Sequence, residues 1–214
     1  MKPHTTITWT GRSVDLTDPH SEDICALDIA HALAHTCRYA GNTPHHYSVA
    51  QHSIIVAKLC PPEMRAYALL HDAAEAYTGD IIRPVRNLVG IAIDRIEQPL
   101  MEVIHEHFGL PPLVPPDWAA EIHTADLVAY VAEEVILRGR DRATVVEETS
   151  LPLSAAFDNP AFDQAVALLH TTTSAHFAER AFHQALTDYH LCEAASEPTS
   201  GTATAAPAQE NTDG

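Results

Sequence analysis

The sequence repeats apolar residues at helical spacing along most of its length, and this periodicity limits the folds that the chain can adopt. Residues 117–138 (DWAAEIHTADLVAYVAEEVILR) place apolar side chains three and four positions apart, which indicates a long amphipathic helix. The same spacing indicates further helices over residues 24–39, 49–59, 64–78, 90–108, 158–170 and 174–191. We therefore expect an all-α bundle.

Signals for helix ends support several of these bounds. Ser48 and Gln51 match a capping box, in which the two side chains satisfy backbone donors at the start of a helix. Pro61 and Pro62 suit the start of the helix over 64–78, and Gly79 suits its end.

Two other prolines predict interruptions. Pro84 disfavours helical geometry at the preceding residue, so residues 80–87 (DIIRPVRN) are expected to be irregular. Pro99 predicts a break or kink within the helix over 90–108.

The two ends of the chain differ from its middle. Residues 5–16 (TTITWTGRSVDL) set β-branched residues around a central Gly-Arg, which predicts a hairpin within an N-terminal extension over 1–20. Residues 21–192 are expected to form the helical domain. From residue 193 to 214 the sequence lacks aromatic and large aliphatic residues, which predicts a disordered tail.

Charge and cysteine usage exclude several classes of protein. A formal net charge of −17 argues against partners such as nucleic acid or an anionic membrane. The four cysteines form no C-x-x-C pair, and scattered thiols suit a reducing compartment. The N-terminus lacks the apolar core of a signal peptide, and no apolar stretch reaches about 18 residues. We expect a soluble, cytoplasmic protein.

One short run carries the strongest chemical signal. Residues 69–80 (LLHDAAEAYTGD) place His71, Asp72 and Glu75 among apolar residues, although ionised carboxylates are rarely buried without a partner. On a helix, His71 and Asp72 would reach around one point, and Glu75 would lie one turn along on the same side. This arrangement suits a metal ion with a nearby proton acceptor.

Two residues elsewhere can complete such a site. His52 lies within an apolar helical segment, and Asp126 lies within the helix over 117–138. With His71 and Asp72 they provide two nitrogen and two oxygen ligands, which suit Zn, Co or Mn better than Mg. The alternative is that His52 only packs in the core and Asp126 is exposed.

At these stretches the chain resembles the HD-domain superfamily of metal-dependent phosphohydrolases, which implies an HD-domain helical bundle. The similarity is greatest to bacterial 5′-deoxynucleotidases and phage dATP triphosphohydrolases. The matching stretches are CRYAGNT (37–43), YSVAQHS (47–53), LLHDAAEAYTGDIIRPVR (69–86) and ADLVAYVAEE (125–134).

The resemblance implies a role for each matching residue. The metal ligands would be His52, His71, Asp72 and Asp126. Glu75 would activate the attacking water, Arg38 would grip phosphate, and Asp80 would contact the sugar 3′-hydroxyl. Tyr39 stands where the deoxynucleotidases have a tryptophan against the sugar 2′ position. Arg83, just past Asp80, is placed to contact a longer phosphate chain.

The function that we expect is metal-dependent hydrolysis of nucleotide phosphates. The opening GRSVDLTDPHSEDI is closer to phage proteins, which favours a deoxynucleoside triphosphate such as dATP and, if a phage encodes the chain, a place in the host cytoplasm. The alternative substrate is a deoxynucleoside monophosphate. The oligomeric state of the similar proteins implies a homo-oligomer.

Three other functions are compatible with an HD domain. A di-iron oxygenase would need further histidine ligands, and a non-catalytic module would retain the fold alone. An alarmone hydrolase would carry a second acid after Glu75, where this chain has Ala76. His31 and His35 have the i,i+4 spacing of metal ligands, but for His31 we favour packing or pocket lining.

Overall fold

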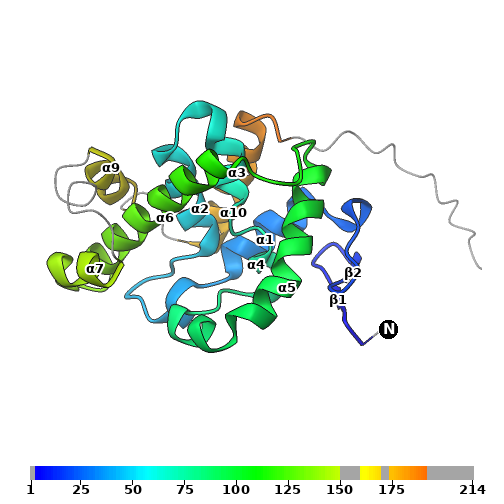
Figure 1. Ribbon diagram of the computed structural model, residues 1–214, viewed down its shortest axis with the longest axis horizontal. Coiled ribbons are helices and arrows are strands. Elements are labelled where there is room, and N and C mark those ends of the chain that lie inside the picture. Colours follow the sequence, from blue (N-terminus) through cyan, green and yellow to red (C-terminus); the bar gives the residue numbers. More distant parts are fainter. Residues whose placement is uncertain (1–2, 150–159, 170–173, 192–214) are drawn as a thin grey trace, which may run out of the picture.

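The computed structural model describes residues 3–149, 160–169 and 174–191, and this part of the chain is an all-α bundle with one short hairpin, as predicted (Figure 1). Its α-helices are α1 (Ala26–His35), α2 (Val49–Leu59), α3 (Arg65–Leu70), α4 (Glu75–Thr78), α5 (Arg83–His107), α6 (Pro116–Ile136), α7 (Arg142–Thr149), α9 (Pro160–Leu169) and α10 (Ala175–Asp188). Single 3-10 turns are η1 (Ser21–Asp23), η2 (Arg38–Gly41) and η3 (Pro62–Met64).

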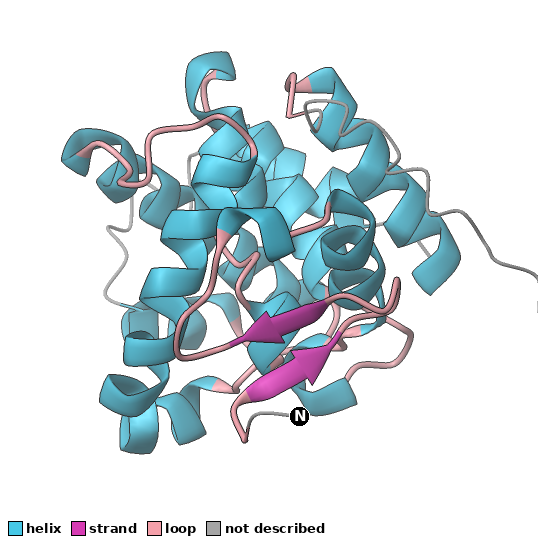
Figure 2. Cartoon of the chain, turned by 90° about the vertical axis from the view of Figure 1, so that its right-hand side faces the viewer, coloured by secondary structure: helices cyan, strands magenta, loops and turns pink. Residues whose placement is uncertain are grey.

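The expected hairpin consists of β1 (Thr5–Ile7) and β2 (Ser13–Asp15), which pair antiparallel. Its connection contains Gly11 with φ 87°, a conformation that glycine adopts without strain. Thr10 attaches the connection to α1, because its backbone N–H and its hydroxyl both donate to the carboxylate of Asp28 at 2.7 Å. The hairpin lies on the outside of the helices (Figure 2).

Helix α2 is the central element of the bundle (Figure 1). It packs against α1, α3, α6, α9 and α10, so that polar residues on it, His52 among them, are buried with its apolar ones. The predicted capping box is confirmed: the backbone N–H of Ser48 donates to Gln51 Oε1 at 3.0 Å, and that of Gln51 donates to Ser48 Oγ at 3.3 Å.

Two expected helices are shorter than predicted. The helix over 24–39 ends at His35, because Thr36 becomes extended and Cys37 forms a β-bridge with Ser48. The helix over 64–78 is divided into α3 and α4 by a tight turn at residues 71–74. In this turn Ala73 N–H donates to Leu70 O at 2.8 Å, a bond between residues three apart instead of four.

Helix α5 corrects the expected irregular segment around Pro84 and the expected break at Pro99. It begins at Arg83, so residues 83–87 are helical; Pro84 lies in the first turn, where a helix needs no backbone N–H. It also continues across Pro99 without a break, and the fully buried Leu100 and Ile104 anchor its second half.

The later elements follow the predicted pattern with one addition. Helices α6, α9 and α10 occupy the expected segments, whereas α7 was not predicted, because only Val145 and Val146 among its residues are buried. The tail over 193–214 lies outside the described residues. Within the described part of the chain, no helix combines the length and apolar character needed to cross a membrane.

Candidate metal centre

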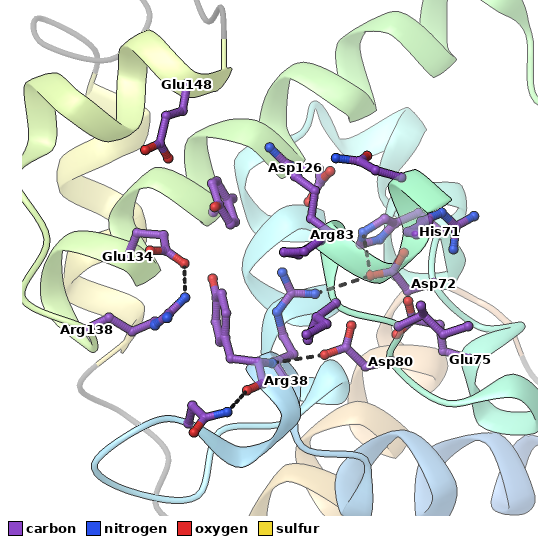
Figure 3. Close-up of a pocket in the computed structure, with 18 of the residues that line it drawn as sticks. Arg38, His71, Asp72, Glu75, Asp80, Arg83, Asp126, Glu134, Arg138 and Glu148 are labelled. Atoms are coloured by element: carbon purple, nitrogen blue, oxygen red, sulfur yellow. Dashed lines mark hydrogen bonds and ion pairs between the residues drawn. The ribbon is translucent and has the colours of Figure 1, made fainter. Parts of the chain in front are cut away.

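Four predicted ligands from three parts of the chain meet at one place. His52 comes from α2, His71 and Asp72 from the turn between α3 and α4, and Asp126 from α6. Nε2 of His52 lies 3.0 Å from Asp126 Oδ1 and 3.7 Å from Asp72 Oδ2, and Nε2 of His71 lies 3.2 Å from Asp72 Oδ2. Figure 3 shows His71 and Asp72, from the turn, close to Asp126 of α6.

The other ring nitrogen of each histidine is already engaged. Nδ1 of His52 donates to Glu133 Oε1 at 2.6 Å, and Nδ1 of His71 donates to the carbonyl of Ala68 at 2.8 Å. These bonds aim Nε2 of both rings at the carboxylates. Both Nε2 atoms are buried, and neither makes a well-directed hydrogen bond within the described residues. Such fixed imidazoles are typical of metal ligands.

The imidazoles and carboxylates of this cluster stabilise one another's charged forms. Burial opposes a charged imidazole at His52, as does Arg38, but Glu133 and Asp126 outweigh both and raise its pKa to about 10. Burial would raise the pKa of Asp72, yet His71 and His52 hold it well below its usual value. The carboxylates therefore stay ionised, and a divalent cation could replace the imidazole protons that balance them.

Glu133 of α6 links the metal ligands to the predicted phosphate-binding residue. It is fully buried and accepts hydrogen bonds from Nδ1 of His52, from Arg38 Nε at 3.2 Å, from Tyr39 Oη at 2.6 Å and from Tyr47 Oη at 2.7 Å. Burial would raise its pKa, but Arg38 and His52 lower it to about 2.

Glu133 was not among the site residues predicted from the sequence. A signal was present, because Glu133 follows Asp126 by two helical turns and therefore shares its face of α6. A glutamate on a face that carries a metal ligand, within an apolar segment, indicates a buried and paired carboxylate.

Glu75 lies beside the cluster without joining it. It begins α4, and it lines the same cavity as Asp72 and Asp126. Its Oε2 is buried and has no hydrogen-bond partner among the described residues. Burial raises the pKa of Glu75 well above its usual value, and the neighbouring Asp72 and Asp80 raise it further.

Arg38, Tyr39 and Asp80 form the adjoining wall. Arg38 NH1 lies 3.6 Å from Asp72 Oδ2, and Tyr39 N–H donates to Asp80 Oδ2 at 3.0 Å. Tyr39 and Ala40 have φ of 58° and 51°, a left-handed conformation that non-glycine residues rarely adopt. The side-chain bond of Tyr39 to Glu133 and its backbone bond to Asp80 hold this conformation.

The cluster opens into a cavity of about 930 Å³, within the size range of small-molecule sites. Away from the metal ligands, its wall comes from α5, α6 and α7. The guanidinium of Arg83 lies over the ring of Tyr130 at 4.4 Å and makes no ion pair within the described part of the chain. By contrast, Arg138 pairs with the buried Glu134 at 2.6 Å (Figure 3), and Arg140 pairs with the same carboxylate at 3.1 Å.

The structure thus brings His52, His71 and Asp72 within metal-ligand distance of one another and places Asp126 beside His52. The other predicted site residues, Glu75, Arg38, Tyr39, Asp80 and Arg83, line the same cavity. Comparison with known proteins adds two bacterial relatives, although no family model matches the chain. The chain is 37% identical over 126 residues to the uncharacterized protein YfdR of Escherichia coli (strain K12). The aligned segment covers 59% of this chain and 68% of YfdR. It is also 37% identical over 142 residues to the uncharacterized protein RCAP_rcc00048 of Rhodobacter capsulatus, which covers 62% of this chain and 72% of that protein.

Proposed function

The chain belongs to the same family as YfdR and RCAP_rcc00048, and we propose that it is an HD-domain, metal-dependent phosphohydrolase that acts on nucleotides. One observation carries this proposal. The buried Nε2 atoms of His52 and His71 face the carboxylates of Asp126 and Asp72 without a well-directed hydrogen bond, and the buried Oε2 of Glu75, beside them, has no hydrogen-bond partner among the described residues.

The donor set fits a divalent transition metal. The residues that would hold it are His52, His71, Asp72 and Asp126, and two imidazoles among four ligands favour Zn, Co or Mn over Mg. When bound, such an ion would supply Lewis-acid activation of a phosphoryl group and of water.

The roles of the neighbouring residues follow from their positions. Glu75 Oε2 would accept a proton from the attacking water, since burial and the neighbouring Asp72 and Asp80 raise the pKa of this carboxyl and make it a stronger base. Glu133 fixes Nε of Arg38, so the terminal nitrogens of Arg38 remain close to Asp72, where they could hold a phosphate oxygen as its charge grows.

The far end of the cavity supports a substrate with several phosphates. Arg83 lines the cavity without a carboxylate partner among the described residues, so its charge is available to a phosphate chain that extends beyond Arg38. Tyr39 and Asp80 would contact the sugar. We therefore favour a deoxynucleoside triphosphate, with dATP as first choice, and triphosphate as the product.

The test is a substrate panel with identification of each product. Metal-free protein is reloaded separately with Zn²⁺, Co²⁺, Mn²⁺ or Mg²⁺ and given deoxy- and ribonucleoside mono-, di- and triphosphates. We expect triphosphate to be released from dATP with a transition metal and not with Mg²⁺ alone. Phosphate release from deoxynucleoside monophosphates only would identify a 5′-deoxynucleotidase instead.

A matched control separates this activity from a contaminant. His71→Asn removes one proposed ligand and should abolish turnover together with metal binding at this site. If no metal gives hydrolysis of any nucleotide, the proposal fails. Oxygen uptake by protein that holds two irons would support the di-iron oxygenase.

A further inference from the structure

A second group of metal-ligating side chains lies outside the proposed active site. His31 and His35 occupy successive turns of α1, and Glu179 reaches them from α10, which packs along α1. One ligand atom from each of the three residues lies within 4.8 Å of the other two. Nδ1 of His31 lies 3.4 Å from Glu179 Oε2.

His31 and His35 can each present a ring nitrogen with a free lone pair, which is the form that binds a metal. Nδ1 of His35 lies 2.8 Å from the carbonyl oxygen of His31 and must donate to it, because a carbonyl only accepts. In the neutral ring, Nε2 of His35 then carries a lone pair. Nδ1 of His31 is buried and has no hydrogen-bond partner among the described residues. The group thus offers two imidazoles and one carboxylate.

The N-terminal hairpin holds one of these rings in place. Trp9 stacks on His31 with ring centroids 4.4 Å apart and an interplanar angle of 10°, although Trp9 itself is 62% exposed. The rings of His31 and His35 lie 4.1 Å apart. Ligands whose orientation is fixed before binding lose less freedom when a metal binds.

The alternative explanation is packing alone. Packing accounts for the stack of Trp9 on His31. It does not account for a buried Nδ1 that faces a carboxylate at 3.4 Å without a hydrogen bond, because burying such a nitrogen without a partner is unfavourable. A cation between the two groups would satisfy both.

We propose that His31, His35 and Glu179 bind a second divalent transition metal ion of the Zn, Co, Ni or Cu type. Two nitrogens and one oxygen suit this class better than Mg or Ca. The ion would join α1 to α10 next to the hairpin. This site uses none of the ligands around His52, so the proposal can be tested independently of the proposed hydrolase activity.

The first test counts bound metal. Metal-free protein is titrated with Zn²⁺, and the bound ion is measured after removal of the excess. We expect two equivalents for the wild type, one for His71→Asn, and one for either His35→Gln or Glu179→Gln. His20→Gln, a histidine outside both groups, should keep two. If His35→Gln and Glu179→Gln both keep two equivalents, the proposal is overturned.

The second test reads the site directly. The chain has two tryptophans, so Trp118→Phe leaves Trp9 as the only one. Cu²⁺ added to Trp118→Phe/His71→Asn protein should quench the Trp9 fluorescence strongly. When Glu179→Gln is introduced into the same protein, Cu²⁺ binding should weaken at least tenfold. Circular dichroism confirms that each variant is folded. Quenching with unchanged affinity in the Glu179→Gln protein would overturn the assignment.

Discussion

Glu133 Oε1 accepts a hydrogen bond from Nδ1 of His52 at 2.6 Å, and neither side chain is exposed to solvent. The bond directs Nε2 of His52 toward the proposed metal position. Because the same carboxylate also accepts from Nε of Arg38, one buried residue positions a proposed metal ligand and a proposed phosphate-binding group together. This arrangement makes Glu133 a positioning residue whose effects can be measured.

Glu133→Gln should weaken Zn²⁺ binding by about 10- to 100-fold, the usual effect of losing a carboxylate behind a histidine ligand. Dialysis against buffered Zn²⁺ measures it. The adjacent Glu134 provides a control, since it is equally buried but pairs with Arg138 and Arg140. Glu134→Gln should keep wild-type affinity. Equal Zn²⁺ affinity in the two variants would contradict the role of Glu133.

Glu75→Gln should retain the metal and lose about 100- to 10,000-fold in turnover, because an amide cannot accept the proton of the attacking water. Metal content and product release are measured on the same sample. Glu97 lines the same cavity but is engaged by Thr78 and Arg86, so Glu97→Gln should remain active. Full activity in Glu75→Gln would remove it from the proposed mechanism.

Arg83→Ala should raise KM for a deoxynucleoside triphosphate by about 10- to 100-fold, which corresponds to a lost hydrogen bond to a charged group. Hydrolysis of a monophosphate, which would not reach Arg83, should change little. Arg86 lines the same cavity, but its guanidinium pairs with Asp94 and Glu97 at 2.8 and 2.7 Å. Arg86→Ala therefore serves as the control, and equal losses on mono- and triphosphates in Arg83→Ala would argue against a phosphate contact.

The pH dependence of stability should include a contribution from His105. Burial lowers the pKa of His105, against the opposing effect of its hydrogen bond to Pro112 O at 2.8 Å. As pH falls below about 6.5, the unfolded chain takes up the proton first, so the free energy of unfolding decreases until the folded ring is protonated as well.

His105→Asn keeps a donor for Pro112 O and cannot titrate, so its free energy of unfolding should fall less steeply between pH 7 and pH 5. The difference should approach, at most, about 1.4 kcal/mol per pH unit. Urea unfolding of both proteins at several pH values measures the two slopes. Parallel slopes would show that His105 does not contribute.

Much of the metal centre could be predicted from the sequence. The spacing of His71, Asp72 and Glu75 placed them together, and the apolar helical settings of His52 and Asp126 marked these two as further ligands, in agreement with the resemblance. The predicted helix over residues 64–78 was partly wrong, because residues 71–74 form a tight turn instead of a regular helix. The side chains still converge, since a turn with helical dihedral angles directs them similarly.

Glu133 could not be identified in the same way. Its donors His52 and Arg38 lie 81 and 95 residues away in the chain, so the contacts exist only after α2 and α6 pack together. The start of α5 was missed for a different reason. Pro84 was interpreted as a helix breaker, whereas in the first turn the same ring favours a helix.

The left-handed backbone at Tyr39 and Ala40 affects how variants of the cavity wall formed by Arg38, Tyr39 and Asp80 should be interpreted. Each such residue costs roughly 1–2 kcal/mol, and Asp80 offsets part of this cost through its bond to the backbone of Tyr39. Without the Asp80 carboxylate, the backbone at Tyr39 would lose a bond that holds its left-handed conformation, and the loop that carries Arg38 could relax. A kinetic defect in an Asp80 variant would then combine a lost substrate contact with a displaced arginine, and only substrate analogues that lack the 3′-hydroxyl could separate the two.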